Sequence, residues 1–367
     1  MRREPGERPV RRILVRCPNW LGDVVMATPG LRALRHAHPE ARIVAQVPST
    51  LAPLLEGSGL VDAIWPLASR GGGLAGWRAD IRRVASEDFD LGVVLPESIS
   101  SALLMRFGRV REVVGFARDP LRRWLLDRVV TAPAEWGRRR MVSRERFVLK
   151  LMAALGANSG DRTLTLAVTA REEARLADAF EQAGVSPESR RGTRWVVIAP
   201  GASFGSAKCW PVERYAALAD HLIELGQEVV LLGAPGESER LRAVDSAMER
   251  SATVLDGTLD VGGLKALLRE ARALVANDAG ARHVAAAFGV PSVIFFGPTS
   301  VSKTADNLSS VEVLETEHDC RPCYRRECPI DHRCLRTIGV DEARQATARA
   351  LLREPPRLDE RARSASE

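Results

Sequence analysis

Two segments of the C-terminal half indicate how this chain folds: PGASFGSAKCWP, from Pro200 to Pro211, and NDAGARHVAAAFGVPSVIFFGPTS, from Asn277 to Ser300. Each follows a short apolar run typical of a buried strand and leads into a run typical of a helix. Backbone N–H groups at a helix start attract phosphate, and glycine lets an anion approach the backbone closely. Two such turns in one half of the chain predict a site for a nucleotide diphosphate that carries a further group.

Strand-like and helix-like segments alternate through both halves of the chain. In the N-terminal half, strands are expected at Ile13–Arg16, Ala41–Val47 and Leu91–Leu95, helices at Val24–Ala37 and Ser98–Phe107, and a loop at Gly71–Gly73. In the C-terminal half, strands are expected at Trp195–Ala199, Glu228–Leu232, Leu274–Ala276 and Ser292–Phe296, and helices at Pro211–Leu225, with Pro in its first turn, and Ser238–Glu249. This alternation predicts an α/β protein whose parallel sheets carry helices on both faces.

The length of 367 residues favours two domains. We expect a Rossmann-like domain over residues 10–180, a second over residues 190–352, and flexible tails at residues 1–9 and 355–367. Two doubly wound domains that face each other leave a central cleft between the carboxyl ends of their sheets, and ligands are expected there.

The composition limits the class of protein. A net charge of +6 suggests an anionic partner, and a hydrophobic fraction of 45% is enough for ordinary cores. Arg16 interrupts the first apolar run, so no secretory signal is expected, and the longest apolar run is too short to span a bilayer. The chain is therefore expected to be cytoplasmic, with cysteines that are reduced or bind metal.

Asp23 is the candidate general base. It lies in PNWLGD directly after the first predicted strand, where a carboxylate can accept a proton from a substrate hydroxyl. Gly22 beside it would let that substrate approach the backbone. An aspartate before a helix is also a common N-cap, and this alternative stays open.

The candidates for donor binding lie in the C-terminal half. A cation such as Lys208 near a helix start suits a diphosphate, and Asp278 can accept hydrogen bonds from sugar hydroxyls. Glu237 is placed like the acidic residue that binds ribose in dinucleotide folds. Each also has a structural alternative: an exposed loop lysine, an N-cap and a first-turn glutamate. The same site is expected to include Gly201, Ser203, Gly280 and His283, the last of which could also be an ordinary helix histidine.

The final motif is CRPCYRRECPIDHRC, from Cys320 to Cys334, which we term the cysteine segment. Its CxxC start has the spacing of zinc ligands, but its two halves lie close together. Free thiols that pack a loop and a closed structural zinc site both stay open as interpretations of Cys320, Cys323, Cys328 and Cys334.

Three segments together resemble glycosyltransferase family 9, the heptosyltransferases: PNWLGDVVMATPGLRAL, PGASFGSAKCWPVERYAALADHL and NDAGARHVAAAFGVPSVIFFGPTS. The resemblance covers the chain from about Ile13 to Leu352. VVLPESISSALLMRFGRVREVVGF and the cysteine segment are most similar to lipopolysaccharide heptosyltransferase II.

The resemblance implies a GT-B fold, with an acceptor-binding N-terminal domain and an ADP-sugar-binding C-terminal domain. It implies an inverting transfer of L-glycero-D-manno-heptose from ADP-heptose to heptosyl-Kdo2-lipid A in lipopolysaccharide inner-core synthesis. By position, Asp23 matches the catalytic base, Lys208 the diphosphate contact, and Asp278 with Gly280 the element that holds heptose and phosphate. Ala279 stands where the family has Ser or Thr, so one hydroxyl contact to the donor is missing.

The implied partners are ADP-heptose, the lipid A-linked core oligosaccharide and the inner face of the inner membrane, with no nucleic acid and no required cofactor or metal. Gly22, Ser98, Arg118 and Arg122 are expected on the acceptor side, where the arginines face lipid phosphates or form a solvated face. The alternatives are a family 9 enzyme with another acceptor or nucleotide sugar, and a non-catalytic nucleotide-binding module. A dehydrogenase is disfavoured because neither half has GxGxxG after its first strand.

Overall fold

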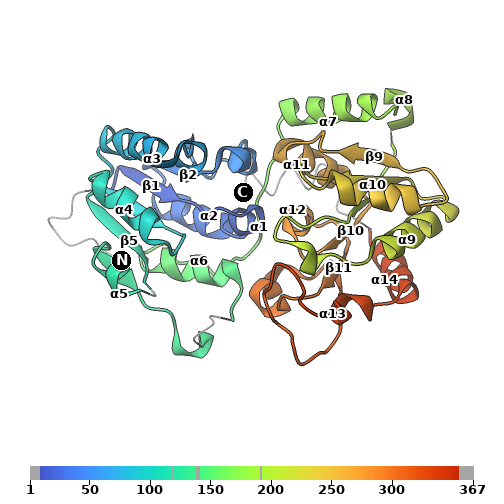
Figure 1. Ribbon diagram of the computed structural model, residues 1–367. Coiled ribbons are helices and arrows are strands. Elements are labelled where there is room, and N and C mark those ends of the chain that lie inside the picture. The colour runs from blue at the N-terminus through green and yellow to red at the C-terminus, as the bar shows by residue number, and fades with distance from the viewer. Residues whose placement is uncertain (1–8, 118, 138–140, 191, 355–367) are drawn as a thin grey trace. The chain divides into compact units, whose positions relative to one another are not determined.

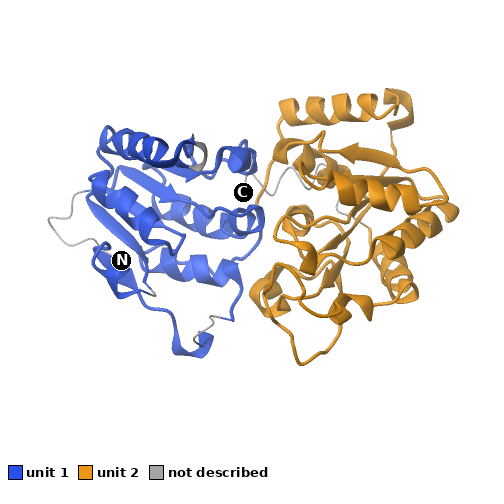
Figure 2. Cartoon of the chain, in the orientation of Figure 1, with its two compact units in different colours: residues 1–164 blue, residues 165–367 orange. Residues whose placement is uncertain are grey.

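The computed structural model describes residues 9–117, 119–137, 141–190 and 192–354. The chain forms two compact units, residues 1–164 and residues 165–367 (Figure 2). Each unit contains one six-stranded sheet covered by helices (Figure 1). No helix in the described ranges has the length and apolar character needed to cross a membrane. The α/β architecture predicted from the alternation is confirmed.

The sheet of the N-terminal unit has the order β3-β2-β1-β4-β5-β6, and all its pairings are parallel. This is the doubly wound Rossmann order, in which the chain reverses direction across the sheet beside β1. The strands are β1 (Arg12–Arg16), β2 (Arg42–Val47), β3 (Ala63–Pro66), β4 (Leu91–Val94), β5 (Glu112–Phe116) and β6 (Arg128–Val130). The helices are α1 (Leu21–Val25), α2 (Thr28–Ala37), η1 (Ser49–Leu54), α3 (Ser69–Ala85), α4 (Ile99–Phe107), α5 (Pro120–Arg123), η2 (Ala134–Trp136) and α6 (Arg144–Ala153).

The C-terminal unit repeats this topology, with the order β12-β11-β10-β7-β8-β9 and parallel pairings throughout. Its strands are β7 (Val196–Ala199), β8 (Val229–Gly233), β9 (Thr253–Asp256), β10 (Ala273–Asn277), β11 (Ser292–Phe296) and β12 (Val311–Glu315). Its helices are α7 (Ala170–Gln182), α8 (Pro187–Arg190), η3 (Ser206–Lys208), α9 (Val212–Glu224), α10 (Ser238–Ala247), α11 (Val261–Glu270), α12 (Gly280–Ala287), η4 (Val301–Asn307), α13 (Arg333–Arg336) and α14 (Val340–Leu352).

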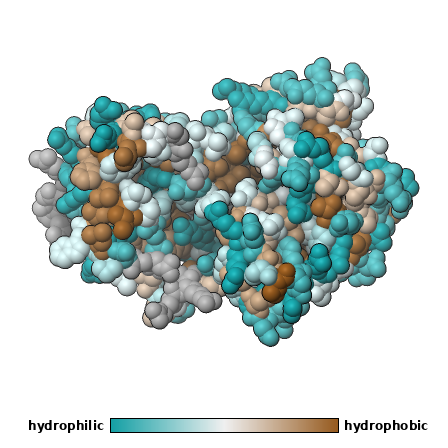
Figure 3. All heavy atoms as spheres, in the orientation of Figure 1, coloured by the Kyte–Doolittle hydropathy of each residue, from teal (hydrophilic) through white to brown (hydrophobic). Residues whose placement is uncertain are grey.

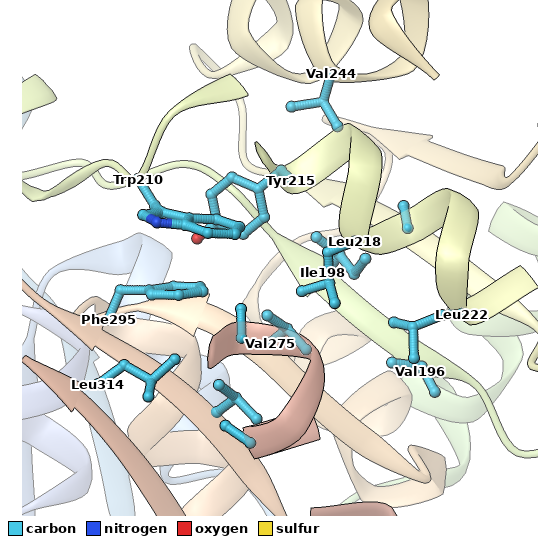
Figure 4. Close-up of a cluster of buried hydrophobic side chains, with 14 of the residues drawn as sticks. Val196, Ile198, Trp210, Tyr215, Leu218, Leu222, Val244, Val275, Phe295 and Leu314 are labelled. Atoms are coloured by element: carbon cyan, nitrogen blue, oxygen red, sulfur yellow. The ribbon is translucent and has the colours of Figure 1, made fainter. Parts of the chain in front are cut away.

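The core of the C-terminal unit is built on Trp210 (Figure 4). Its indole is fully buried and stacks on Phe295 of β11, with ring centroids 4.3 Å apart. The indole Nε1 donates to the Ile338 carbonyl at 3.0 Å, so its one polar atom is satisfied. Truncating such a side chain would cost about 3–5 kcal/mol of stability. Because Lys208 precedes Trp210 by two residues, the core fixes one end of the loop that carries the lysine.

The single helix expected at Val24–Ala37 is two helices, α1 and α2. Pro29 has no N–H group, so it cannot bond the Val25 carbonyl as a continuous helix would require. The hydroxyl of Thr28 donates to that carbonyl instead, at 2.7 Å.

Two other local predictions were wrong. The expected loop at Gly71–Gly73 lies inside the span of α3, where Gly73 has φ 51° and interrupts the regular helix. Pro211 is the N-cap of α9 rather than part of its first turn.

The boundary between the units falls at Leu164/Thr165, earlier than the predicted end of the N-terminal domain at residue 180. Helix α7 belongs to the C-terminal unit because it packs against α11. There the buried Lys265 ammonium lies 3.0 Å from the Glu172 carboxylate, and Thr169 closes a capping box at the helix start.

Candidate functional site

In the C-terminal unit, the predicted donor residues lie at the carboxyl ends of neighbouring strands. Gly201 and Ser203 follow β7, Glu237 follows β8, and Asp278 follows β10. Strand order alone therefore brings these groups to one edge of the sheet, as the topological switch point requires.

Asp278 is the electrostatic centre of this edge. The Lys208 ammonium and the Thr299 hydroxyl both bond its Oδ2, at 3.0 and 2.6 Å, and Arg282 Nε bonds Oδ1 at 2.7 Å. Burial opposes ionisation, but Arg282 and Lys208 outweigh it and hold the pKa of Asp278 well below its usual range. The structure thus brings Lys208 and Asp278 together as an ion pair, and Lys208 is not a free loop lysine.

Glu237 contacts the loop that follows β7. Its carboxylate accepts from the Ala234 N–H at 3.2 Å and from the Ser203 hydroxyl, while burial raises its pKa. A Cβ on Gly201 would lie 2.1 Å from a Glu237 carboxylate oxygen, so a larger residue there would force the Glu237 side chain to move. Gly201, Ser203 and Glu237 therefore lie close together, and their role in donor binding stays a prediction. A carboxylate accepts more than two hydrogen bonds, so Glu237 keeps capacity for ligand hydroxyls.

Helix α12 starts at Gly280, directly after Asp278 and Ala279. Ala279 is the N-cap and supplies no side-chain hydrogen bond, which leaves the first N–H groups of this helix without a side-chain cap. Burial, followed by the charge of Arg282, lowers the pKa of His283 well below its ordinary value. His283 is therefore a neutral imidazole at pH 7, next to an anion-attracting helix start.

Two residues of this site were missed in the sequence. Arg282 is almost fully buried, and its Nη1 and Nη2 have no hydrogen-bond partner among the described residues. The i,i+4 spacing from Asp278 was the signal that could have revealed it. Asn277 is fully buried: its amide donates to the Pro200 and Gly201 carbonyls at 2.8 and 3.2 Å, and its Oδ1 accepts from Trp210 N. Asn277, at the end of β10, thus links this strand to both ends of the segment from Pro200 to Trp210.

In the N-terminal unit, Asp23 lies within α1 and not before it, because Trp20 is the N-cap. The capping alternative for Asp23 is therefore wrong. Its side chain is 32% exposed, and Arg144 Nε lies 3.9 Å from Oδ1. Gly22 is buried beside it. An accessible carboxylate at the carboxyl end of β1, with one cation nearby, is suited to accept a proton from a bound hydroxyl.

The prediction that Arg122 faces lipid phosphates is wrong. Its side chain is fully buried, and Nε donates to the Phe116 carbonyl at 2.7 Å and Nη2 to the Pro96 carbonyl at 2.8 Å. Arg122 thus joins the segments that follow β4 and β5, and burial lowers its pKa. Ser98 is the N-cap of α4, accepting from Ser101 N at 3.4 Å. Arg118 lies outside the described residues.

The four thiols of the cysteine segment, those of Cys320, Cys323, Cys328 and Cys334, all line one small cavity of about 20 Å³ and form no disulfide. Within the described ranges, no three His, Cys, Asp or Glu side chains are arranged to hold a metal ion. The metal content of the cysteine segment stays a prediction for measurement.

Comparison with known proteins gives matches over most of the chain. The model of glycosyltransferase family 9 (heptosyltransferase) matches residues 77–333. Lipooligosaccharide heptosyltransferase 2 of Haemophilus ducreyi is 30% identical, over 80% of this chain and 85% of the relative. Lipopolysaccharide heptosyltransferase 1 of Pseudomonas aeruginosa is 29% identical, over 86% of this chain and 87% of the relative.

The solved structure of Escherichia coli ADP-heptose lipopolysaccharide heptosyltransferase II is also similar, with 26% identity and a TM-score of 0.75 over 93% of this chain and 98% of that one. This likeness confirms the GT-B fold predicted for the two Rossmann-like units. Relatives of types 1 and 2 match at nearly equal identity, so the comparisons support the family and not a single member. The chain belongs to glycosyltransferase family 9, the heptosyltransferases.

Proposed function

We propose that this enzyme transfers L-glycero-D-manno-heptose from ADP-heptose to heptosyl-Kdo2-lipid A, with inversion at the anomeric carbon. The observation that carries the proposal is the cluster of Lys208, Asp278 and Glu237 at one sheet edge of a family 9 chain. The similar Escherichia coli structure is named for ADP-heptose and lipopolysaccharide, in agreement with this donor and this type of acceptor.

The C-terminal unit is proposed to bind the donor. The Lys208 ammonium and the N–H groups at the start of α12, beginning at Gly280, are suited to the diphosphate. Glu237 is suited to ribose hydroxyls, and Asp278, held ionised by Arg282, is suited to heptose hydroxyls. His283 stays neutral, so it can donate or accept one hydrogen bond without adding charge.

The N-terminal unit is proposed to bind the lipid-linked sugar. Asp23 then takes the proton from the acceptor hydroxyl, whose oxygen attacks the anomeric carbon of heptose while the bond to the ADP oxygen breaks. Arg144 places a positive charge beside Asp23. The displaced ADP carries the negative charge away on its terminal phosphate, near Lys208. No cofactor is required by this sequence of events.

The acceptor class implies a membrane surface, and we propose that the enzyme works at the inner face of the inner membrane. Trp124 is 84% exposed and Leu121 59% exposed, and Arg123 between them is also exposed. Figure 3 shows exposed hydrophobic side chains on the N-terminal unit. An aromatic and an aliphatic side chain beside an arginine suit an interface with anionic lipid. Replacing Trp124 by Ala should weaken cosedimentation with anionic vesicles, and unchanged cosedimentation would contradict this assignment.

One observation favours a second candidate, a family 9 transferase with a different nucleotide sugar. Ala279 cannot supply the hydroxyl that the family's motif offers to the donor. The two candidates differ in which nucleotide sugar the protein binds.

The deciding experiment incubates the protein with ADP-heptose and heptosyl-Kdo2-lipid A and measures ADP release and the mass of the product lipid. Parallel reactions replace ADP-heptose by UDP-glucose, or the acceptor by Kdo2-lipid A. The proposal expects a heptose-sized mass gain only with the first pair. A product only from UDP-glucose, or only from Kdo2-lipid A, would refute it, and absence of any transfer would favour a non-catalytic module.

A further inference from the structure

The cysteine segment makes hydrogen bonds to the loop that follows β11. Arg321 Nε donates to the Gly297 carbonyl at 2.6 Å, and Tyr324 N donates to the Pro298 carbonyl at 2.9 Å. Arg321 Nη2 also approaches the Thr299 carbonyl at 3.4 Å. Three consecutive carbonyls of this loop are therefore held by two residues of the cysteine segment.

The same segment holds the loop that follows β7. Both backbone groups of Ala207 are used: its N–H donates to the Arg326 carbonyl at 3.0 Å, and its carbonyl accepts from His332 Nε2 at 2.7 Å. Because a carbonyl only accepts, this imidazole carries its proton on Nε2. A Cβ on Gly205 would lie 2.3 Å from the Arg326 carbonyl oxygen, which shows how closely the two backbones pack.

The two loops meet at one atom. Lys208, next to Ala207, and Thr299, at the end of the other loop, both bond Asp278 Oδ2. His332 bonds the carbonyl of Ala207, the neighbour of Lys208, and Arg321 bonds the carbonyl of Thr299 itself. A shift of either loop would therefore move a group of the proposed donor site.

The segment adopts a strained backbone where it holds these loops. Tyr324 has φ 53° and His332 has φ 59°, in the left-handed region that residues other than glycine rarely occupy. Such strain persists only where surrounding contacts determine the conformation, and it gathers at functional sites.

We propose that Arg321 and His332 are positioning residues for the donor diphosphate, His332 acting through Lys208 and Arg321 through Thr299 and Asp278. This inference rests on the proposed function and adds to it two residues outside the predicted donor set. The cysteine segment then serves donor binding as a template that sets the spacing of the two loops, and takes no part in proton transfer.

The test compares ADP binding by calorimetry with steady-state kinetics for both substrates, using the full-length protein. His332→Ala should weaken ADP binding about tenfold, the effect of losing one well-placed contact. His332→Gln, which keeps an N–H donor at similar reach, should restore affinity to within about threefold of wild type. Arg321→Lys keeps the charge but not the fork of donors, and should also raise the KM for ADP-heptose. The KM for the lipid acceptor should not change.

Arg333→Ala is the matched control, because Arg333 lies in the same segment, is 54% exposed and pairs with the exposed Asp331. The inference would be overturned if wild type binds ADP and both His332→Ala and Arg321→Lys bind it as tightly as this control does. A parallel rise in the KM values of both substrates would also overturn it, because it indicates general loosening. If His332→Ala does not fold, His332→Gln and Arg321→Lys decide the same question. Wild-type protein that binds no ADP would refute the proposed function itself.

Discussion

Replacing Lys208 by Ala tests the proposed donor site most directly. The Lys208 ammonium bonds Asp278 twice, at 3.0 Å from Oδ2 and 2.5 Å from the backbone carbonyl. An ammonium has three N–H donors, so a diphosphate either takes the third donor or competes with Asp278 for one of the other two. Asp278 keeps Arg282 and Thr299 when this happens, so its charge stays compensated.

The size of the effect follows from this exchange. A charge-assisted hydrogen bond contributes about 1.5–3 kcal/mol, and the lysine's bond to Asp278 offsets part of that gain. We therefore expect Lys208→Ala to weaken ADP binding about ten- to a hundredfold, at about 1.4 kcal/mol per tenfold. Adenosine has no phosphate, so its affinity should stay within about twofold of wild type.

The assay is calorimetric titration of ADP and of adenosine into wild type, Lys208→Ala and Lys150→Ala. Lys150 is an exposed lysine of α6 and controls for the loss of one positive charge. An unchanged affinity of Lys208→Ala for ADP would refute the reasoning. So would an equal loss of affinity for ADP and adenosine, because that result indicates a distorted loop and not a lost phosphate contact.

Three further predictions follow from the site. Asp23→Asn should bind ADP-heptose normally but turn over about 10²–10⁴-fold more slowly, and near-normal turnover in a coupled ADP-release assay would exclude Asp23 as the base. The pKa of His283 is lowered by burial, so the unfolded chain takes up a proton below its ordinary pKa of about 6.5 while the folded protein does not. Stability should therefore fall as the pH drops below about 6.5, and chemical denaturation of His283→Gln should show a smaller fall. If the cysteine segment binds zinc, the site should be closed and structural, so a chelator should lower the melting temperature without abolishing turnover of the folded protein. Elemental analysis that finds under about a tenth of an equivalent of zinc would establish plain thiols.

Local sequence patterns were sufficient to predict the layers and part of the site. Short aliphatic runs such as Val196–Ala199 are typical of strands buried on both faces, and their alternation with helices favours parallel order. Since parallel strands present their carboxyl ends at one edge, Lys208 and Asp278 could be expected to share a site although about seventy residues separate them.

The tertiary structure decided what local patterns cannot express, namely which polar groups are paired in the interior. Arg122 lies in an arginine-rich stretch whose pattern predicts a solvated face. Its guanidinium is nevertheless buried, because it donates to backbone carbonyls of the segments after β4 and β5. Helix α7 joins the C-terminal unit because Glu172 meets Lys265, a partner far along the chain. Sequence periodicity determines which face of an element is apolar. The partners of a buried charge are set by long-range packing, since a charge tolerates burial only where distant groups compensate it.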